Sequence, residues 1–363
     1  MDPIERKTPL HDEHVRLGAL MAPFAGWQMP IHYGSILDEA RHTRTAVSLF
    51  DISHMGEFIV REDPGSSSLD FAITIPVVSM RTGRCKYGFL LHEKGGFLDD
   101  LIAYRIRDDE WMLVVNASNE ARDFDTIRGL LSGKASITNI SSEIVKLDLQ
   151  GPMARDVLVD VAGRGISALS YFGFDHFELF GASCLISRTG YTGELGYEIY
   201  ADPERGALLW TELLKNSAVR PAGLGARDIL RLEMGLPLYG HELDEETTPA
   251  EAGMERFLDM GKEFNGKEAV RERIATGPRK RLVGLLAEGR RTPRHENPIL
   301  WEGRRAGVVT SGAFSPHLGR GIGMGYIATE GSGRGTAITV DTGKGDFPAL
   351  VETVPFLTTT SIK

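Results

Sequence analysis

The stretch FLDDLIAYRIRDDEWMLVVNAS, residues 97–118, constrains the fold most, because it predicts a β-hairpin. Two runs rich in strand-forming residues flank the polar tetrapeptide RDDE at 107–110, which is the pattern of a hairpin turn. The first run nevertheless contains two adjacent carboxylates, Asp99 and Asp100, although aspartate is depleted in strands. A fold built on this hairpin therefore has to accommodate two acidic side chains inside a sheet.

Side chains alternate between the two faces of a strand, so Asp99 and Asp100 point in opposite directions. The face of Asp99 carries four more residues: Phe97, Leu101, Ala103 and Arg105. The face of Asp100 is the more apolar one and carries four others: Leu98, Ile102, Tyr104 and Ile106. We expect Asp99 to form a structural, surface-type pair. A carboxylate on an apolar face costs free energy unless it is paired or hydrogen-bonded, so Asp100 is the candidate for contact with a polar ligand.

The turn of the hairpin determines what lies opposite Asp100. A two-residue turn at 108–109 would place Asp100 opposite Ala117, one residue from Asn116. One end of the hairpin would then carry a carboxylate and an amide, while its middle is apolar. The alternative is that Asp100 ends its strand and accepts hydrogen bonds from turn amides.

A further carboxylate stands in TGYTGELGYEIY, residues 189–200. Its glycines predict tight turns rather than a phosphate-binding loop, because no GK[ST] follows and the next residues have a strand pattern. In that strand Glu198 and Tyr200 share one face, and Tyr197 and Ile199 share the other. Glu198 is therefore either a solvent-facing residue or a second candidate for the site.

Arg227 belongs to GARDILRLEMGL, residues 225–236, which predicts a helix that is apolar nearly all round and therefore buried. At helical spacing Arg227 lies on the stripe of Leu230 and Met234, with Arg231 beside it. A structural ion pair is the simplest interpretation of this arginine.

The remaining chain mixes helices and strands. Periodicity predicts further helices over residues 35–48, 154–163 and 204–216. Strand patterns dominate residues 50–116 and return at 177–200, where glycine turns interrupt them. After about residue 278 short strands with glycine and proline punctuation predict a separate all-β domain. A chain of 363 residues has room for two or three domains.

Composition and charge argue against several classes of function. The formal net charge of −9 disfavours a nucleic-acid-binding surface, and no apolar run approaches the roughly 18 residues of a membrane span. The two cysteines, Cys85 and Cys184, are isolated and the ten histidines show no ligand spacing, so we expect no metal. The first residues show no targeting peptide, and a reducing cytoplasm is the expected location.

Ten segments, in order along nearly the whole chain, carry a resemblance to a known family. They are TPLHDEHVRLG, FAGWQMPIHYGS, RTAVSLFDISHMG, KGGFLDDLI, VVNASN, LQGP, TGYTGELGYEI, GLGARDILRLEMGLPLYGHELD, TTPAEAG, and VTSG followed by GMGYI. The chain resembles the aminomethyltransferases, the T-proteins of the glycine cleavage system. Any one segment is only suggestive, but the set in this order and spacing is very specific.

The resemblance implies an α+β fold in which three domains form a cloverleaf around a folate site. Two mixed α/β domains would be followed by a C-terminal all-β domain that is barrel- or jelly-roll-like. The implied bounds are residues 1–50 with 145–245 for the first, discontinuous domain, 51–144 with 246–277 for the second, and 278–363 for the third.

The resemblance also implies an activity. Members of the family transfer the one-carbon unit of an aminomethyl group on lipoylated H-protein to tetrahydrofolate, which gives 5,10-methylenetetrahydrofolate and ammonia during glycine degradation. Tetrahydrofolate would be the acceptor and lipoylated H-protein the partner. No metal, nucleic acid or membrane is expected to take part.

The catalytic aspartate of the family matches Asp100, in agreement with the strand face on which Asp100 lies. Nine positions match residues of the family's folate site: Met55, Tyr87, Val114, Asn116, Tyr171, Tyr191, Glu198, Arg227 and Tyr239. Glu198 would accept from the 2-amino group and N3 of the pterin, and Arg227 suits the anionic tail of folate or the approach of the lipoyl arm. A negative charge at Asp100 would stabilise the cationic carbon that develops as a C–N or C–S bond breaks.

The chain departs from the family pattern at several positions. Leu195 replaces the aspartate of the usual TGEDG, Arg256 and Phe257 occupy a region where the family has a tryptophan near the pterin, and the tail PFLTTTSIK lacks the usual basic or tyrosine-containing ending. TGELG also occurs in the folate domains of sarcosine and dimethylglycine dehydrogenases, so one alternative is a folate-dependent demethylase of a methylamine or sulfonium donor. The other is a non-catalytic folate-binding iron–sulfur maturation factor, although the chain lacks that branch's KGCYxGQE motif.

Overall fold

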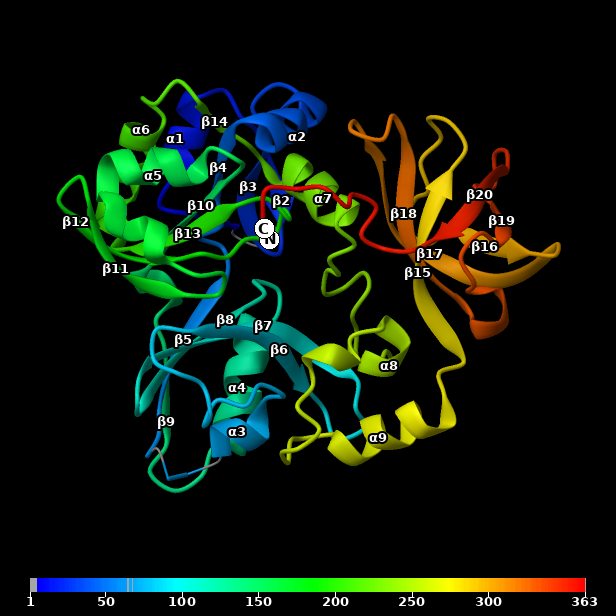
Figure 1. Ribbon diagram of the computed structural model, residues 1–363, viewed down its shortest axis with the longest axis horizontal. Coiled ribbons are helices and arrows are strands. Elements are labelled where there is room, and N and C mark those ends of the chain that lie inside the picture. Colours follow the sequence, from blue (N-terminus) through cyan, green and yellow to red (C-terminus); the bar gives the residue numbers. More distant parts are fainter. Residues whose placement is uncertain (1–4, 64, 67, 363) are drawn as a thin grey trace.

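The computed structural model describes residues 5–63, 65–66 and 68–362. Figure 1 shows three parts: two in which helices accompany a β-sheet, and a β-barrel near the C-terminal end of the chain. The predicted fold class, mixed α/β sheets followed by an all-β domain, is thereby confirmed. The bounds of the three domains stay a prediction.

The first sheet is built from strands that are far apart in the sequence. Its strand order is β11 (Phe174–Leu179), β12 (Ala182–Ser187), β13 (Gly196–Ala201), β10 (Val145–Gln150), β4 (Val47–Asp51) and β14 (Val219–Pro221). The helices of this part are α1 (His11–Arg16), α2 (Ile36–Thr45), α5 (Ala154–Ala162), α6 (Gly206–Leu213) and α7 (Leu224–Glu233). A small sheet of β1 (Arg6–Lys7), β3 (Trp27–His32) and β2 (Leu20–Phe24) packs on α7 through β3. Because α5 contacts β13 and α6 contacts β10, one face of the central strands is covered and the other remains for the second sheet.

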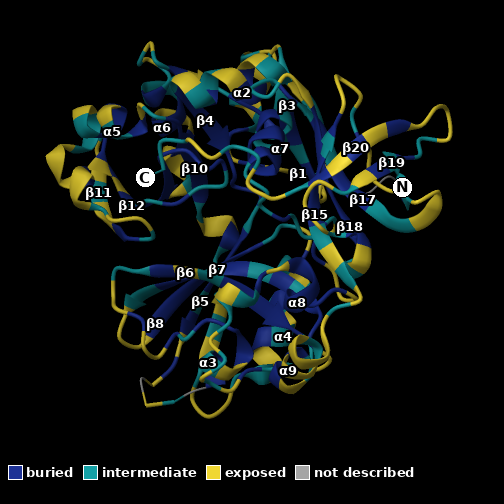
Figure 2. Ribbon diagram, turned by 45° about the vertical axis from the view of Figure 1, so that its right-hand side comes forward, coloured by how far each residue is buried: buried dark blue, intermediate teal, exposed yellow. Residues whose placement is uncertain are grey.

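The second sheet has the strand order β6 (Cys85–Leu91), β7 (Phe97–Arg107), β8 (Glu110–Val115), β5 (Gly56–Arg61) and β9 (Ser136–Asn139). Its helices α3 (Ser68–Ala72) and α4 (Glu120–Leu130) share one hydrophobic core with the sheet. Two later helices, α8 (Pro249–Ala252) and α9 (Lys267–Thr276), pack on the end of β7 around Phe97. Figure 2 shows the strands of this sheet largely buried.

The barrel after residue 278 confirms the predicted all-β domain. It closes in the order β15 (Lys280–Ala287), β18 (Arg320–Ala328), β17 (Arg304–Ser315), β16 (Pro298–Trp301), β19 (Ala337–Val340) and β20 (Phe347–Glu352). Short 3-10 helices lie at Ser141–Glu143, Arg164–Ala168, Pro203–Arg205, Glu255–Phe257 and Thr329–Gly331. The last described residues return from the barrel to the turn that precedes β13, where the Ser361 amide donates to Glu194 at 2.8 Å.

The predicted helices form with shorter bounds than their sequence patterns. The helix predicted at 35–48 begins at Ile36, because the side chain of Ser35 accepts from the backbone amide of Asp38 at 3.3 Å and caps it. It ends before Val47, where β4 begins. The helix predicted at 225–236 is α7, and its burial is confirmed.

The hairpin predicted at 97–118 is formed by β7 and β8, but its register differs by one residue from a plain two-residue turn. Ile102 pairs with Val114, and an irregularity between Arg105 and Arg107 takes up the difference. Such irregularities insert an unpaired residue into one strand and shift the pairing beyond it.

This shift brings Asp100 opposite Asn116 rather than Ala117, so the predicted cross-strand neighbour is wrong by one residue. The prediction that Asp99 forms a surface-type pair is also wrong, because its side chain is 0% exposed. The face of Asp99 is the one that shares the hydrophobic core of α3 and α4, with Leu101. A strand's own residues do not reveal which face helices will cover.

Candidate functional site

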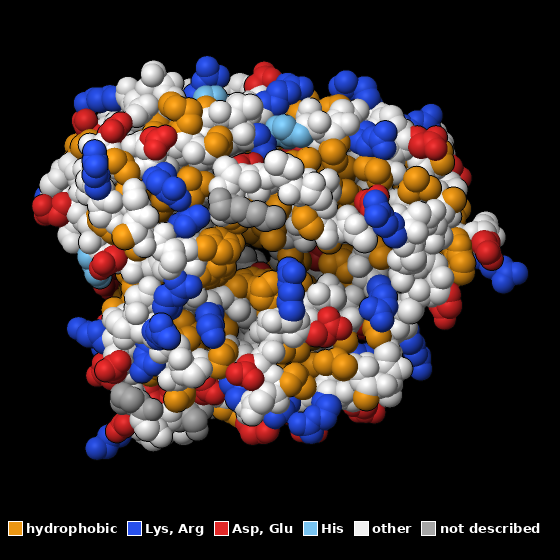
Figure 3. All heavy atoms as spheres, in the orientation of Figure 1, with side chains coloured by type: hydrophobic (Ala, Val, Ile, Leu, Met, Phe, Trp, Pro, Cys, Tyr) orange, Lys and Arg blue, Asp and Glu red, His pale blue; other side chains and the backbone are white. Residues whose placement is uncertain are grey.

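The two sheets meet face to face at Tyr104. Its hydroxyl, on β7, lies 2.9 Å from the hydroxyl of Tyr200, 3.1 Å from Oγ of Ser187 and 3.2 Å from Oε2 of Glu198. Asp100 and Tyr104 share a face of β7, so the faces of Asp100 and Glu198 are turned toward each other. Figure 3 shows the surface hollowed near the centre of the molecule, where the three parts of Figure 1 meet.

Asp100 is held by fixed donors rather than by turn amides. The hydroxyl of Tyr87 donates to Oδ2 at 2.9 Å, and Nδ2 of Asn116 donates to Oδ1 at 2.8 Å. Burial and the neighbouring charge of Asp99 raise the pKa of Asp100 to about 7. A carboxyl with such a pKa can both accept and release a proton near neutral pH.

Asp99 lies on the other face of β7 and also accepts hydrogen bonds from Asn116. Its carboxylate accepts from the backbone amide of Asn116 at 2.9 Å, from Nδ2 of Asn116 at 2.8 Å and from Nδ2 of Asn119 at 2.7 Å. Next to it, burial and the charge of Asp99 raise the pKa of Asp123 to about 11. The carboxyl oxygens of Asp123 have no hydrogen-bond partner among the described residues unless Asp123 carries a proton.

Glu198 is buried, so the solvent-facing alternative is wrong. Its side chain is about 5% exposed, and Oε2 accepts from Oγ1 of Thr189 at 2.7 Å as well as from Tyr104. Burial alone would raise its pKa, but the ammonium of Lys146, the Thr189 hydroxyl and the charge of Arg227 bring the pKa of Glu198 below its ordinary value. Glu198 is thus a buried anion at neutral pH.

Arg227 forms the structural ion pair that its sequence position suggested. Its Nη1 lies 2.5 Å from Oδ2 of Asp148, and its guanidinium carbon lies 5.0 Å from the centre of the Tyr191 ring. Burial raises the pKa of Asp148 to about 7, although Arg227 opposes the shift. The same guanidinium also lowers the pKa of Glu198, which places Arg227 in the electrostatic field of the site.

The other predicted folate-site residues differ in how directly they contact Asp100. Tyr87 and Asn116 contact Asp100 directly, and the charge of Asp100 contributes to raising the pKa of Tyr191. Val114 is buried opposite Ile102, and Sδ of Met55 lies 3.7 Å from Nζ of Lys146.

Two more of the predicted tyrosines, like Tyr191, have no described hydrogen bond to Asp100 or Glu198, and the hydroxyl of Tyr191 donates to the carbonyl of Pro237. Tyr171 is 44% exposed and packs edge-on against Phe172. The hydroxyl of Tyr239 accepts from Arg122 at 3.1 Å. The structure therefore brings together Tyr87, Asn116 and Asp100 most closely, and the roles of all predicted residues stay predictions.

Several polar residues of the site were missed by the sequence reasoning. They are Tyr104, Lys146, Asp148, Gln150, Ser187 and Thr189. The signal was present in VKLDLQ, residues 145–150, because Lys146, Asp148 and Gln150 stand at alternate positions and therefore share one face of β10. Asp148 pairs with Glu198 across the sheet, so this polar face is the face of Glu198.

Phe257, in the region that departs from the family pattern, makes an aromatic contact of its own. Phe257 packs edge-on against Tyr87, with ring centres 5.0 Å apart. The guanidinium carbon of Arg256 lies 4.7 Å from the centre of the Phe257 ring. Phe257 thus supports the tyrosine that donates to Asp100.

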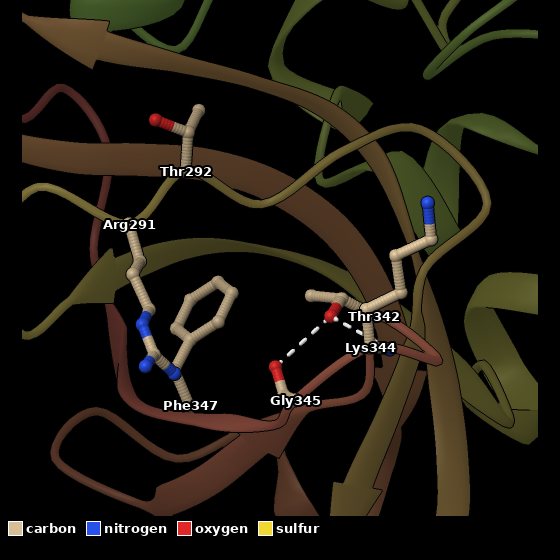
Figure 4. Close-up of a pocket in the computed structure, with 6 residues that line it drawn as sticks. All are labelled: Arg291, Thr292, Thr342, Lys344, Gly345 and Phe347. Carbon is tan, nitrogen blue, oxygen red and sulfur yellow. Dashed lines mark hydrogen bonds between the residues drawn. The ribbon is translucent and has the colours of Figure 1, made fainter.

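A separate surface cavity of about 340 Å³ lies on the barrel, and Figure 4 shows the side chains that line it. Its lining residues are Arg291, Thr292, Thr342, Lys344, Gly345 and Phe347. None of these residues belongs to the sheets that carry Asp100 and Glu198, so the cavity is distinct from the candidate site.

No group of three His, Cys, Asp or Glu side chains within residues 5–63, 65–66 and 68–362 is arranged to hold a metal ion. Over the same part of the chain, every helix is too short or too polar to cross a membrane.

Comparisons with known proteins match nearly the whole chain. A family model described as the GCVT N-terminal domain matches residues 10–262, and one described as the glycine cleavage T-protein C-terminal barrel domain matches residues 280–357. An aminomethyltransferase of Halothermothrix orenii is 41% identical over 357 residues, which are 97% of this chain and 100% of that protein.

A second related sequence and a solved structure match the chain in the same way. An aminomethyltransferase of a Geobacillus species is 40% identical over 357 residues, 97% of this chain and 98% of the relative. The crystal structure of glycine cleavage system aminomethyltransferase T from Bartonella henselae matches with a TM-score of 0.93 and 33% identity, covering 99% of both chains.

Proposed function

The chain belongs to the glycine cleavage T-protein family of aminomethyltransferases, and on this premise we propose that its site transfers a one-carbon unit to tetrahydrofolate. The donor would be the aminomethyl group carried on the lipoyl sulfur of H-protein. The C–S and C–N bonds of that carbon break, and bonds to N5 and N10 of tetrahydrofolate replace them. The products are 5,10-methylenetetrahydrofolate, ammonia and the free lipoyl thiol.

The observation that carries this proposal is the carboxylate of Asp100, fixed by Tyr87 and Asn116 on the face of β7 that it shares with Tyr104. As the aminomethyl group loses a substituent, positive charge develops on its carbon, and a preorganised anion in a water-poor site stabilises it. Because its pKa is raised to about 7, Asp100 can also take the proton that a folate nitrogen loses as it bonds to the carbon.

Glu198 would orient the pterin. Its Oε2 already accepts from Thr189 and Tyr104, whereas Oε1 accepts none of the hydrogen bonds found among the described residues. An anionic oxygen suits the 2-amino and N3 donors of the pterin edge, because charge-assisted hydrogen bonds are the stronger ones. Arg227 would contribute positive charge toward the anionic end of the substrate, although Asp148 already holds one of its amino groups.

The proposal is tested by turnover with tetrahydrofolate and aminomethyl-loaded H-protein. We expect 5,10-methylenetetrahydrofolate and ammonia in equal amounts. Sarcosine and a sulfonium donor, supplied separately with tetrahydrofolate, serve as the alternative donors. Transfer from either of these and none from aminomethyl-loaded H-protein would show that the chain is a demethylase instead.

A further inference from the structure

Lys146 is a buried cation that the proposed function does not use. It lies on β10 and its side chain is 1% exposed. The sole hydrogen bond of its ammonium found among the described residues is to the thioether of Met55 at 3.7 Å. A thioether is a weak acceptor, whereas an ammonium carries three N–H donors. Burial of a charge costs free energy unless strong partners are present, and the described residues give the Lys146 ammonium no strong acceptor within hydrogen-bond distance.

The two neighbouring carboxyl groups do not supply these acceptors. Oε1 of Glu57 and Oε1 of Glu198 each lie 3.9 Å from Nζ of Lys146, beyond hydrogen-bond distance. Burial raises the pKa of Glu57 to about 8, which makes its carboxyl largely neutral at pH 7. The ring of Tyr200 adds a cation–π contact, with Nζ of Lys146 4.8 Å from the ring centre.

The side chains of Lys146 and Glu198 lie on the same face of the first sheet. Lys146 pairs with Tyr200 across the sheet and Asp148 pairs with Glu198, so the side chains of Lys146 and Glu198 are diagonal neighbours on one face. Oε1 of Glu198 has no described hydrogen bond and is the oxygen nearest to Nζ of Lys146 within that side chain. The face therefore presents an unused acceptor beside an unused donor.

That pair matches one edge of a pterin. The edge presents, side by side, a 2-amino donor, an N3–H donor and a 4-oxo acceptor. A carboxylate satisfies the two donors, and the acceptor that follows them requires a donor from the protein. Resting on the proposed function, we propose that Lys146 donates to the 4-oxo group while Glu198 accepts from N3–H and the 2-amino group.

The assignment predicts discrimination at a single atom of the substrate. The 4-thioxo analogue of tetrahydrofolate keeps the 2-amino and N3–H donors but offers sulfur, a weaker acceptor, to Lys146. The wild-type protein should therefore bind tetrahydrofolate about tenfold or more tightly than this analogue, the range expected for one charge-assisted hydrogen bond.

Lys146→Met keeps the apolar stem and removes the donor. Calorimetric titration should show that Lys146→Met binds tetrahydrofolate more weakly. The ratio of the affinities for tetrahydrofolate and for the 4-thioxo analogue should fall toward one. Lys146→Arg, which keeps a charged donor, should restore part of the preference. The matched control is Lys86→Met at an exposed position on β6, which should leave both affinities unchanged.

The outcomes separate the two proposals. If the wild-type protein binds tetrahydrofolate and Lys146→Met, folded by its melting curve, keeps the full preference, the role of Lys146 is wrong and the proposed function stands. If the wild-type protein does not bind tetrahydrofolate, both are wrong. If Lys146→Met does not fold, Lys146→Arg decides. A reduced but remaining preference for tetrahydrofolate over the 4-thioxo analogue supports the assignment, and a preference equal to that of the wild-type protein would overturn it.

Discussion

Asn116 donates from its side-chain nitrogen to Oδ1 of Asp100 at 2.8 Å, across the hairpin that joins β7 and β8. The same nitrogen lies 2.8 Å from Oδ1 of Asp99, on the opposite face of the strand. One amide thus ties the candidate catalytic carboxylate to a carboxylate in the core of the second sheet. The position of Asp100 is therefore set by the fold and needs no ligand to define it.

Asp99→Asn is expected to destabilise the protein by about 2–3 kcal/mol, because the new amide turns donors toward the donors of Asn116 and Asn119. The measurement is denaturant unfolding. Asp109→Asn, at the exposed turn of the same hairpin, is the matched control and should change stability by less than about 0.5 kcal/mol. Equal effects of the two substitutions would show that the buried network around Asp99 contributes nothing.

Asp123→Asn should alter how stability depends on pH. Asp123 keeps its proton in the folded protein up to a pKa of about 11, whereas in the unfolded chain it loses that proton at about pH 4. Between these values the folded state binds more protons, so its stability falls as pH rises, by at most about 1.4 kcal/mol per pH unit.

The amide cannot lose that proton, so the stability of Asp123→Asn relative to wild type should increase from pH 5 to pH 9. Denaturant unfolding across this range gives the difference directly. Parallel stability curves for the two proteins would mean that Asp123 is ionised in the folded state.

Glu198→Ala should weaken tetrahydrofolate binding by tens-fold or more, because loss of a charged partner in a buried site costs about 2–4 kcal/mol. Calorimetry with the folded variant measures this. The control is Glu178→Ala, an exposed glutamate on β11 of the same sheet. Unchanged affinity in Glu198→Ala would remove Glu198 from the pterin edge.

Arg231 joins α7 to the barrel. Its guanidinium lies 2.7 Å from Oε2 of Glu242 and donates to Oγ of Ser311 at 2.7 Å. Arg231→Met leaves Glu242 buried without its cation, so a loss of about 3–5 kcal/mol is expected in denaturant unfolding. Arg320→Met, at an exposed end of β18, should be nearly neutral, and a similarly small effect at Arg231 would contradict this account.

The sequence pattern was sufficient for the hairpin, for the opposite directions of Asp99 and Asp100, and for an all-β domain after residue 278. Those features depend on local alternation and turn residues. The register was missed by one residue because the irregularity between Arg105 and Arg107 leaves no local signature.

The burial of Asp99 and the environment of Glu198 could not be read from their own strands. Asp99 is buried by the core that its sheet forms with α3 and α4, and Glu198 is buried by contact with Tyr104, which is 94 positions away in the chain. Contacts of this range depend on how the two sheets are placed against each other. The alternating polar residues of β10 were the one local sign of that buried face.

The central claim is that the charge of Asp100 acts in the transition state. Asp100→Asn keeps the shape and the capacity to accept from Tyr87 while it removes the charge. The decisive measurement is the single-turnover rate of one-carbon transfer from aminomethyl-loaded H-protein, made beside tetrahydrofolate affinity on the same protein. We expect the rate to fall about 10²-fold, equivalent to ~3 kcal/mol, with tetrahydrofolate affinity nearly unchanged. A wild-type transfer rate in folded Asp100→Asn would contradict the account.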